Sequence, residues 1–163
     1  MAKNNGSYQR NSFAGIPRIV MDHPDYIGLS FSAKAALQEL ARQYRGQNNG
    51  DLTLAWSVLK PRGFGSKGTV TKLTEELLAA NLIVRTRVGV FRNPGAKCAL
   101  YALSWIPINE CPGKQLEVGP TTTPPRQFSI ENNKTPGPQN EPGSVHKLGR
   151  DRPRDSRGRY SSS

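Results

Sequence analysis

The stretch GSKGTVTKLTEELLAANLIVRTRVG, residues 65–89, changes its periodicity halfway along and decides the predicted fold. Its first half repeats apolar side chains at the spacing of one helical face, while small polar and basic residues fill the other positions. The apolar positions are Val70, Leu73 and Leu77. Ser66 is a favoured helix cap, and Asn81 tolerates the left-handed conformation that closes many helices, so we expect a helix over residues 67–80.

The second half of the stretch predicts a β-strand over residues 82–88. Apolar or β-branched side chains alternate there with arginines, which is typical of a strand with one buried face. A bend with the sequence GVFRNPGAK follows, and a second strand is expected over residues 98–105, so the two strands form a hairpin with a long basic tip. The alternating positions are Val84, Thr86 and Val88 on the buried face and Arg85 and Arg87 on the open face.

Two helical segments are predicted near the N-terminus. Residues 18–21 are expected to be extended, and Asp22 is expected to cap a short helical turn in which Pro24 takes a first-turn position. An amphipathic helix follows, begun by Ser30 or Ser32. Its apolar face is formed by Leu37, Leu40, Ala41 and Tyr44.

A short helix is predicted between the two amphipathic helices. Leu52 is expected to add a single rung of strand, and Thr53 to cap about two helical turns after it. Because a proline disfavours helical geometry in the residue before it, we expect this helix to end at Pro61.

The predicted order of elements is that of a winged helix-turn-helix, an α+β fold with a helical core and a C-terminal β-hairpin wing. We place this domain at residues 16–107, which hold nearly all of the periodic apolar signal. Residues 1–15 are polar and are expected to be flexible. Residues 108–163 scatter few apolar side chains among Pro, Gly, Asn and Thr, so we expect a disordered tail, ending in the basic run GRDRPRDSRGRYSSS.

The charge of the chain points to an anionic partner. The 163 residues include 23 Lys and Arg against 12 Asp and Glu, a net charge of +11. Nucleic acid is the first candidate partner and an anionic membrane surface is the second. The sequence lacks an apolar run of about 18 residues and the apolar centre of a signal peptide, so we expect a cytoplasmic protein with no membrane partner.

Neither a metal site nor an active site is predicted. Cys98 and Cys111 form no CxxC pair and have no histidine at ligand spacing. His23 and His146 are isolated, and no nucleophile with a base, carboxylate pair or metal cluster can be assembled from the predicted domain. We therefore expect no cofactor, no metal and no enzymatic activity.

The exposed face of the helix over residues 67–80 is the predicted DNA-recognition surface. The major groove is wide enough to admit a helix, and a step of about 100° per residue turns Gly68, Thr71 and Lys72 outward. Basic residues of the hairpin are expected to follow the phosphates or to enter the adjoining minor groove. The predicted DNA-binding residues are Arg62, Ser66, Lys67, Gly68, Thr71, Lys72, Arg85, Arg87, Arg92 and Lys97.

The stretch LSFSAKAALQELARQYRGQNNGDLTLAWSVLKPRGFGSKGTVTKLTEELLAANLIVRTRVG resembles a group of small winged helix-turn-helix proteins encoded by bacterial phages, plasmids and integrated elements. The resemblance covers residues 16–105, and its more specific parts are LARQY, NNGDLT and the run from Ser66 through LLAANLI. It implies double-stranded DNA binding, in the role of a transcriptional regulator or a replication accessory factor.

Two alternatives to duplex binding remain open at this point. Helix-turn-helix modules also occur in proteins that bind only protein, so the chain could be a basic inhibitor or adaptor of a host protein or ribonucleoprotein complex. RNA binding through the arginine-rich residues after Gly149 is the other alternative. No coiled coil or additional dimer helix is visible, so a monomer and a homodimer are equally expected.

Overall fold

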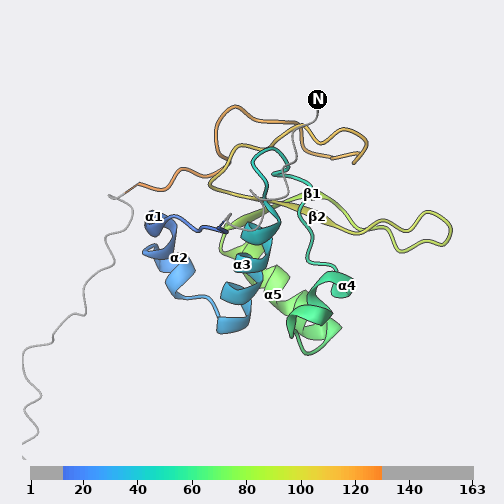
Figure 1. Ribbon diagram of the computed structural model, residues 1–163, viewed down its shortest axis with the longest axis horizontal. Helices are drawn as coiled ribbons and strands as arrows, with labels where there is room; N and C mark the ends of the chain where they lie inside the picture. The colour runs from blue at the N-terminus through green and yellow to red at the C-terminus, as the bar shows by residue number, and fades with distance from the viewer. Residues whose placement is uncertain (1–12, 130–163) are drawn as a thin grey trace, which may run out of the picture.

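A computed structural model describes residues 13–129 of the chain, and it combines helices with a two-stranded antiparallel sheet (Figure 1). This confirms the α+β class. The predicted flexible residues 1–12 and the predicted tail over 130–163 lie outside the described residues. The elements in chain order are α1 (Arg18–Met21), α2 (Pro24–Ile27), α3 (Phe31–Gln43), α4 (Trp56–Leu59), the 3-10 helix η1 (Lys60–Arg62), α5 (Lys67–Ala79), β1 (Ile83–Arg87) and β2 (Leu100–Leu103).

The two long helices begin where local signals predict, but α3 ends at Gln43, so Tyr44, predicted on its apolar face, lies just after it. The Ser30 hydroxyl accepts a hydrogen bond of 3.2 Å from the backbone N–H of Ala33 at the start of α3. The Ser66 hydroxyl accepts one of 3.1 Å from the N–H of Thr69 at the start of α5. These contacts satisfy backbone donors that the first turn of a helix leaves without intrahelical partners. After α5, Asn81 has a φ of +53°, which confirms that it closes the helix in the left-handed region.

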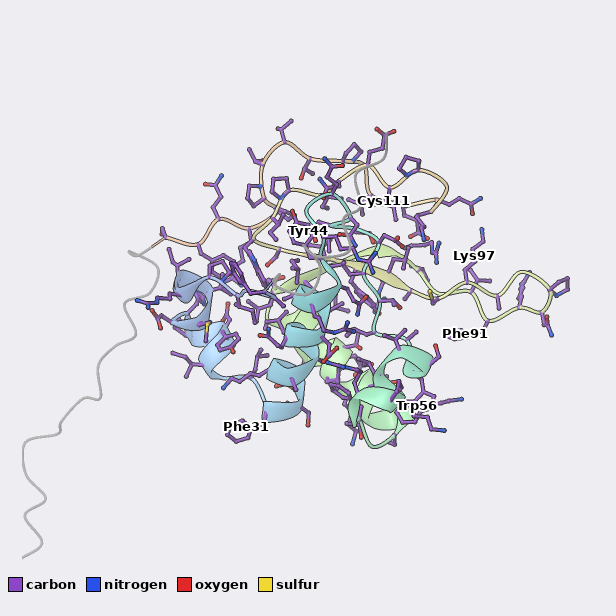
Figure 2. The ribbon with its side chains drawn as sticks, in the orientation of Figure 1. Phe31, Tyr44, Trp56, Phe91, Lys97 and Cys111 are labelled. Atoms are coloured by element: carbon purple, nitrogen blue, oxygen red, sulfur yellow. The ribbon has the colours of Figure 1, made fainter. Side chains whose placement is uncertain are left out.

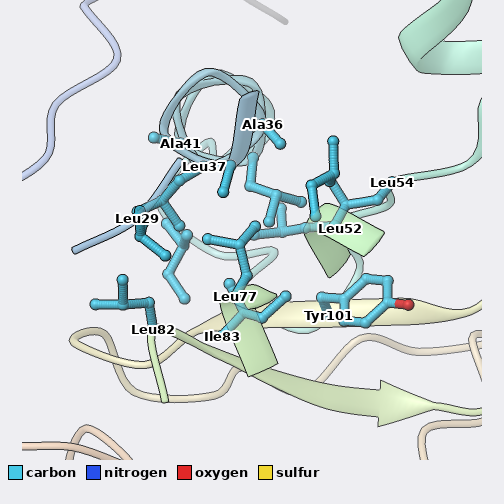
Figure 3. Packing of buried hydrophobic residues seen from close by; sticks show 14 of the residues in the cluster. Leu29, Ala36, Leu37, Ala41, Leu52, Leu54, Leu77, Leu82, Ile83 and Tyr101 are labelled. Atoms are coloured by element: carbon cyan, nitrogen blue, oxygen red, sulfur yellow. The ribbon is translucent and has the colours of Figure 1, made fainter. Parts of the chain in front are cut away.

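The main core lies between α3, α5 and one face of the sheet. Figure 3 shows Leu37 of α3 and Leu77 of α5 meeting Ile83 of β1 and Tyr101 of β2. All four side chains are buried, and the predicted apolar positions Val70, Leu73 and Leu77 of α5 are buried as expected. Truncating a fully buried leucine of this kind costs about 2–5 kcal/mol, so the position of α5 against the sheet is strongly fixed.

The strand pairing contains a bulge that changes the predicted alternation. Ile83 pairs with Leu103 and Arg85 with Tyr101, but the register shifts between Arg85 and Arg87. The predicted buried position Val88 is therefore wrong: this side chain is 47% exposed, because a bulge rotates the residues that follow it. The predicted rung of strand is confirmed, since Leu52 forms a bridge to Tyr101 on the other edge of β2.

Two local predictions near the N-terminus are wrong. Residues 18–21 form helix α1 rather than an extended segment, and the carbonyl of Pro17 accepts hydrogen bonds from the N–H groups of Val20 and Met21. The prediction failed because a window of four residues is too short to reveal a helical period. The cap of α2 is consequently His23, whose Nδ1 accepts from the N–H of Asp25 at 3.1 Å, and not Asp22, which ends α1.

The α-helix α4 ends at Leu59, next to the predicted end, but helical geometry continues past Pro61 in the 3-10 helix η1. Lys60 keeps helical angles, φ −53° and ψ −51°, and α4 continues directly into η1. A proline is tolerated in the first turn of a new helix, because its missing N–H would have no intrahelical acceptor there. Thr53 accepts a bond of 3.1 Å from the N–H of Ala55, the residue before α4, so the helix begins later than predicted.

Residues 108–129 were predicted to be disordered, and the structure contradicts this for that range. They belong to a segment over residues 106–129, here termed the C-terminal segment, which lies on the face of the sheet opposite the helices (Figure 1). Its backbone donates hydrogen bonds to Thr86 O (2.7 Å, from Glu117) and Ser104 O (2.9 Å, from Arg126). Leu100 and Ala102 are buried on this second face, outside the main core cluster.

The C-terminal segment is ordered by polar contacts that a count of apolar side chains does not include. The buried side chain of Asn49 donates to Ile106 O at 2.8 Å and accepts from the N–H of Leu103 at 2.7 Å. The Arg126 guanidinium forms an ion pair of 2.6 Å with Asp25, and it lies 4.4 Å from the centre of the Phe128 ring. These partners are far apart in sequence, so composition alone does not reveal them.

Candidate nucleic-acid interface

The β-hairpin extends well beyond the part of the sheet that covers the core (Figure 1). Val90 and Lys97 hold its two arms together through a pair of backbone hydrogen bonds of 2.8 Å each. Side chains between these two residues are exposed, including Arg92 and Phe91. The hairpin therefore presents a narrow arm, carrying cations and one aromatic ring, beside the N-terminal half of α5.

A groove separates the hairpin from α4 and α5. It encloses a volume of about 730 Å³, and one side is formed by the groove-facing residues of α5. These are Lys67, Val70, Thr71, Thr74 and Glu75. Trp56 of α4 lies at one end, and Arg85, Tyr101 and Phe91 contribute from the sheet and hairpin. The face of α5 predicted to read DNA is thus not covered by the chain, and part of it forms the wall of an open groove.

The residues at the start of α5 have separate structural and surface roles. Ser66 caps α5, because its hydroxyl accepts a hydrogen bond of 3.1 Å from the Thr69 N–H. The side chain of Ser66 therefore has a structural partner within the protein. Gly68 is exposed, and a Cβ built there would meet only the Ser66 hydroxyl, at 3.8 Å. The protein's own packing therefore does not require glycine at residue 68. Lys67 and Lys72 are exposed on the same two turns.

Arg62 is compensated by an acid of α3. Its guanidinium donates to Glu39 Oε1 from Nε at 3.0 Å and from Nη2 at 2.8 Å, and Arg42 pairs with the other carboxylate oxygen. Burial raises the pKa of the Glu39 carboxyl, but the hydrogen bonds from Arg62 and Arg42 outweigh it and hold the pKa below its ordinary value. The same contact raises the pKa of Arg62. This pair connects α3 to η1.

Arg87 and Lys97 attach the hairpin to the C-terminal segment. The Arg87 guanidinium donates to Cys98 O at 2.8 Å and to Lys114 O at 2.6 Å. The Lys97 ammonium contacts the side-chain oxygen of Gln115. Both residues were predicted to bind DNA. In the structure, both side chains donate hydrogen bonds to acceptors within the protein.

The remaining predicted cations are free of acidic partners. Within residues 13–129, none of Lys67, Lys72, Arg85 and Arg92 forms an ion pair. Arg85 lies in the groove beside Tyr101, where burial raises the pKa of the tyrosine hydroxyl and the nearby guanidinium opposes that rise. These four residues are here termed the free cations. Lys67 and Lys72 lie in the N-terminal half of α5, and Arg85 and Arg92 lie in the hairpin.

The aromatic residues of the groove were missed at the sequence level. Trp56 packs against the main core, and its half-buried side chain also lines the groove. Phe91 is 96% exposed, and Figure 2 shows its ring on the side of the hairpin that faces α4, with Lys97 directed to the other side. The signal that could have revealed Phe91 is the apolar run VGVF immediately before Arg92, in the predicted basic tip of the hairpin.

Comparisons of the chain with protein-family models, curated proteins and solved structures found no match. In the part of the chain that the structure describes, no helix is long and apolar enough to cross a membrane. Over the same residues, no group of three or more His, Cys, Asp and Glu side chains is placed to hold a metal ion. The geometry and charge of α5, the hairpin and the groove therefore carry the functional argument.

Proposed function

We propose that the protein binds double-stranded DNA through a winged helix-turn-helix, with α5 as the recognition helix and the β-hairpin as the wing. The observation that carries this proposal is the position of the free cations, all on the exposed side of α5 and the hairpin and none paired with an acid within residues 13–129. Solvated cations gathered on one surface provide the counterion-release contribution to duplex binding.

The two turns at the start of α5 fit the recognition role. The exposed residues Gly68, Thr71 and Lys72 lie on its outward side, while Val70 and Leu73 are buried against the core. A helix presented in this way can enter the major groove, where lysine reads guanine edges and a threonine methyl packs against thymine. The absence of a side chain at Gly68 lets the backbone approach a phosphate closely.

The hairpin fits the role of the wing. Arg92 is exposed near its tip, and Arg87 fixes its base by donating hydrogen bonds to Cys98 O and Lys114 O. A basic arm held at a defined angle beside the recognition helix would follow the phosphates or enter the next minor groove. The role of a regulator or replication accessory factor of a phage, plasmid or integrated element rests on the sequence resemblance and is part of the same proposal.

Duplex binding by purified protein tests the proposal. Fluorescence anisotropy would be measured at low salt with labelled duplexes of random sequence and with duplexes from the genetic element that encodes the chain. We expect the double variant Lys67→Ala, Lys72→Ala to bind more weakly and with less sequence preference. Arg18→Ala is the control, because this exposed cation lies on α1, away from the hairpin (Figure 1).

Two results would contradict the proposal. Absence of duplex binding by the wild type at low salt would leave the protein-binding adaptor as the favoured function. Equal loss of affinity per removed charge in Arg18→Ala and in the double lysine variant would show that overall charge, rather than the surface of α5, governs binding.

A further inference from the structure

The groove beside α5 carries a more specific inference, which rests on the proposed DNA binding. We propose that this groove receives an unpaired base of DNA, with Phe91 stacking against it, so that the protein prefers a junction between duplex and single strand to a continuous duplex.

The hairpin exposes apolar side chains where a solvated loop ordinarily carries polar ones. Phe91 is 96% exposed, Val88 is 47% exposed, and Val90 is 41% exposed. Phe91 and Val88 both line the groove, and exposed apolar side chains gathered at a groove are typical of a surface that binds a partner. Flat aromatic ligands cover a phenylalanine ring well, and nucleobases stack on aromatic side chains whatever their sequence.

The size and walls of the groove suit a nucleotide. Its volume of about 730 Å³ falls within the range of small-ligand sites, about 300–1,000 Å³. Trp56, Val70 and Tyr101 provide apolar and aromatic walls for a base. Lys67 and Arg85 lie in the same groove, where they would meet phosphate oxygens.

A single acid in the groove is also compatible with a base. Glu75 lines the wall formed by α5, and no ion pair holds it within residues 13–129. A carboxylate accepts hydrogen bonds from exocyclic amino groups, such as N4 of cytosine. Two cations and one acid around apolar walls complement a nucleotide, which combines an anionic backbone with amino groups on a flat ring.

Only an unpaired base would present the surface that the groove needs. Bases inside a continuous duplex are stacked on both faces and offer proteins only their edges. A ring face becomes available at a strand end, a fork or a flipped position. Lys67 and Thr71 belong to both the groove wall and the exposed surface of α5, so a base in the groove would directly continue the duplex contact.

Three DNA probes test this inference with the full-length protein. The first is a blunt duplex, the second carries a short single-stranded overhang, and the third carries an overhang of equal length without bases. The two overhangs have the same charge, so a difference between them reports contact with bases. We expect the base-bearing overhang to bind between about fivefold and a hundredfold more tightly than the abasic one, as expected for one stacked base.

Variants of Phe91 assign the contact to the groove. Because this ring is almost fully exposed, Phe91→Ala removes little packing, and we expect it to reduce the affinity for the base-bearing overhang to that for the abasic one. Phe91→Trp should retain the preference. Phe31→Ala is the control, since this ring is 90% exposed at the start of α3 and does not line the groove. Fluorescence of 2-aminopurine at the first unpaired position should be quenched by wild type but not by Phe91→Ala.

The outcomes separate this inference from the proposed function. Equal affinity for the base-bearing and abasic overhangs, with firm binding of the blunt duplex, would overturn the inference and leave duplex binding intact. Full preference in Phe91→Ala would also overturn it. Failure to bind any of the three probes at low salt would overturn both proposals.

Discussion

The salt dependence of duplex binding tests how the structure divides the predicted cations. Within residues 13–129, four of them have no acidic partner, whereas the other three donate to carboxylate, carbonyl or amide oxygens. The three bonded cations are Arg62 with Glu39, Arg87 with two backbone carbonyls, and Lys97 with Gln115. We expect alanine at all four free cations to lower the salt dependence of binding markedly, and alanine at the three bonded cations to change it little.

The expected magnitudes follow from counterion release. Each phosphate contact on duplex DNA contributes about 0.9 to the slope of log affinity against log salt. The loss of four contacts therefore lowers the magnitude of the slope by about 3.6. When salt rises from about 50 to 200 mM, the affinity of this variant should fall by a factor roughly 150 times smaller than that of the wild type. The bonded triple variant would lower it by about 2.7 if those side chains also met phosphates, but by less than about 0.9 if they do not.

Anisotropy titrations over that salt range measure the slopes. Full-length variants are compared with one another, because the basic residues outside 13–129 are common to all of them and cancel in the difference. Circular dichroism at each salt concentration checks that Arg87→Ala has not unfolded the hairpin. A drop near 2.7 in the bonded triple variant, or a drop below about 1 in the free quadruple variant, would refute the division of cations.

Three further predictions concern the parts of the fold that position the interface. Asn49→Ala leaves the buried N–H of Leu103 without its acceptor, so urea unfolding should show a loss of about 1–3 kcal/mol. Gln47→Ala, at an exposed neighbour, should cost under about 0.5 kcal/mol. The pKa of Glu39 is lowered in the folded state. The stability that Glu39 contributes is therefore present above the ordinary pKa of 4.5 and is lost as the pH falls through the folded-state pKa. The difference in melting temperature between wild type and Glu39→Gln that is measured at pH 7 should vanish in acid. Arg126→Ala removes the ion pair to Asp25 and should speed amide hydrogen exchange over residues 117–126, while the amides of α3 stay protected. Equal protection of residues 117–126 in the variant and the wild type would contradict the role given to this arginine.

Local signals in the sequence predicted the two long helices and the strand that follows α5. Ser30 and Ser66 bond to N–H groups three residues away, and Asn81 closes α5 through its own backbone angle. Each of these interactions lies within a few residues, so neighbouring side chains specify it. The exposed face of α5, with Lys67 and Lys72, was predictable for the same reason, because helical periodicity fixes which residues turn outward.

The partners of the arginines and the order of the C-terminal segment were decided only by the tertiary structure. Asn49 reaches Leu103 and Ile106 across more than 50 residues, and Arg87 reaches Lys114 across 27. No local pattern records such a pair, so the sequence could not separate free cations from bonded ones. The groove arises in the same way, because Trp56 and Phe91 come together only when the hairpin extends past α4 and α5. Spacing along the chain determined the elements, whereas contacts between distant residues determined which charges and rings remain available to a ligand.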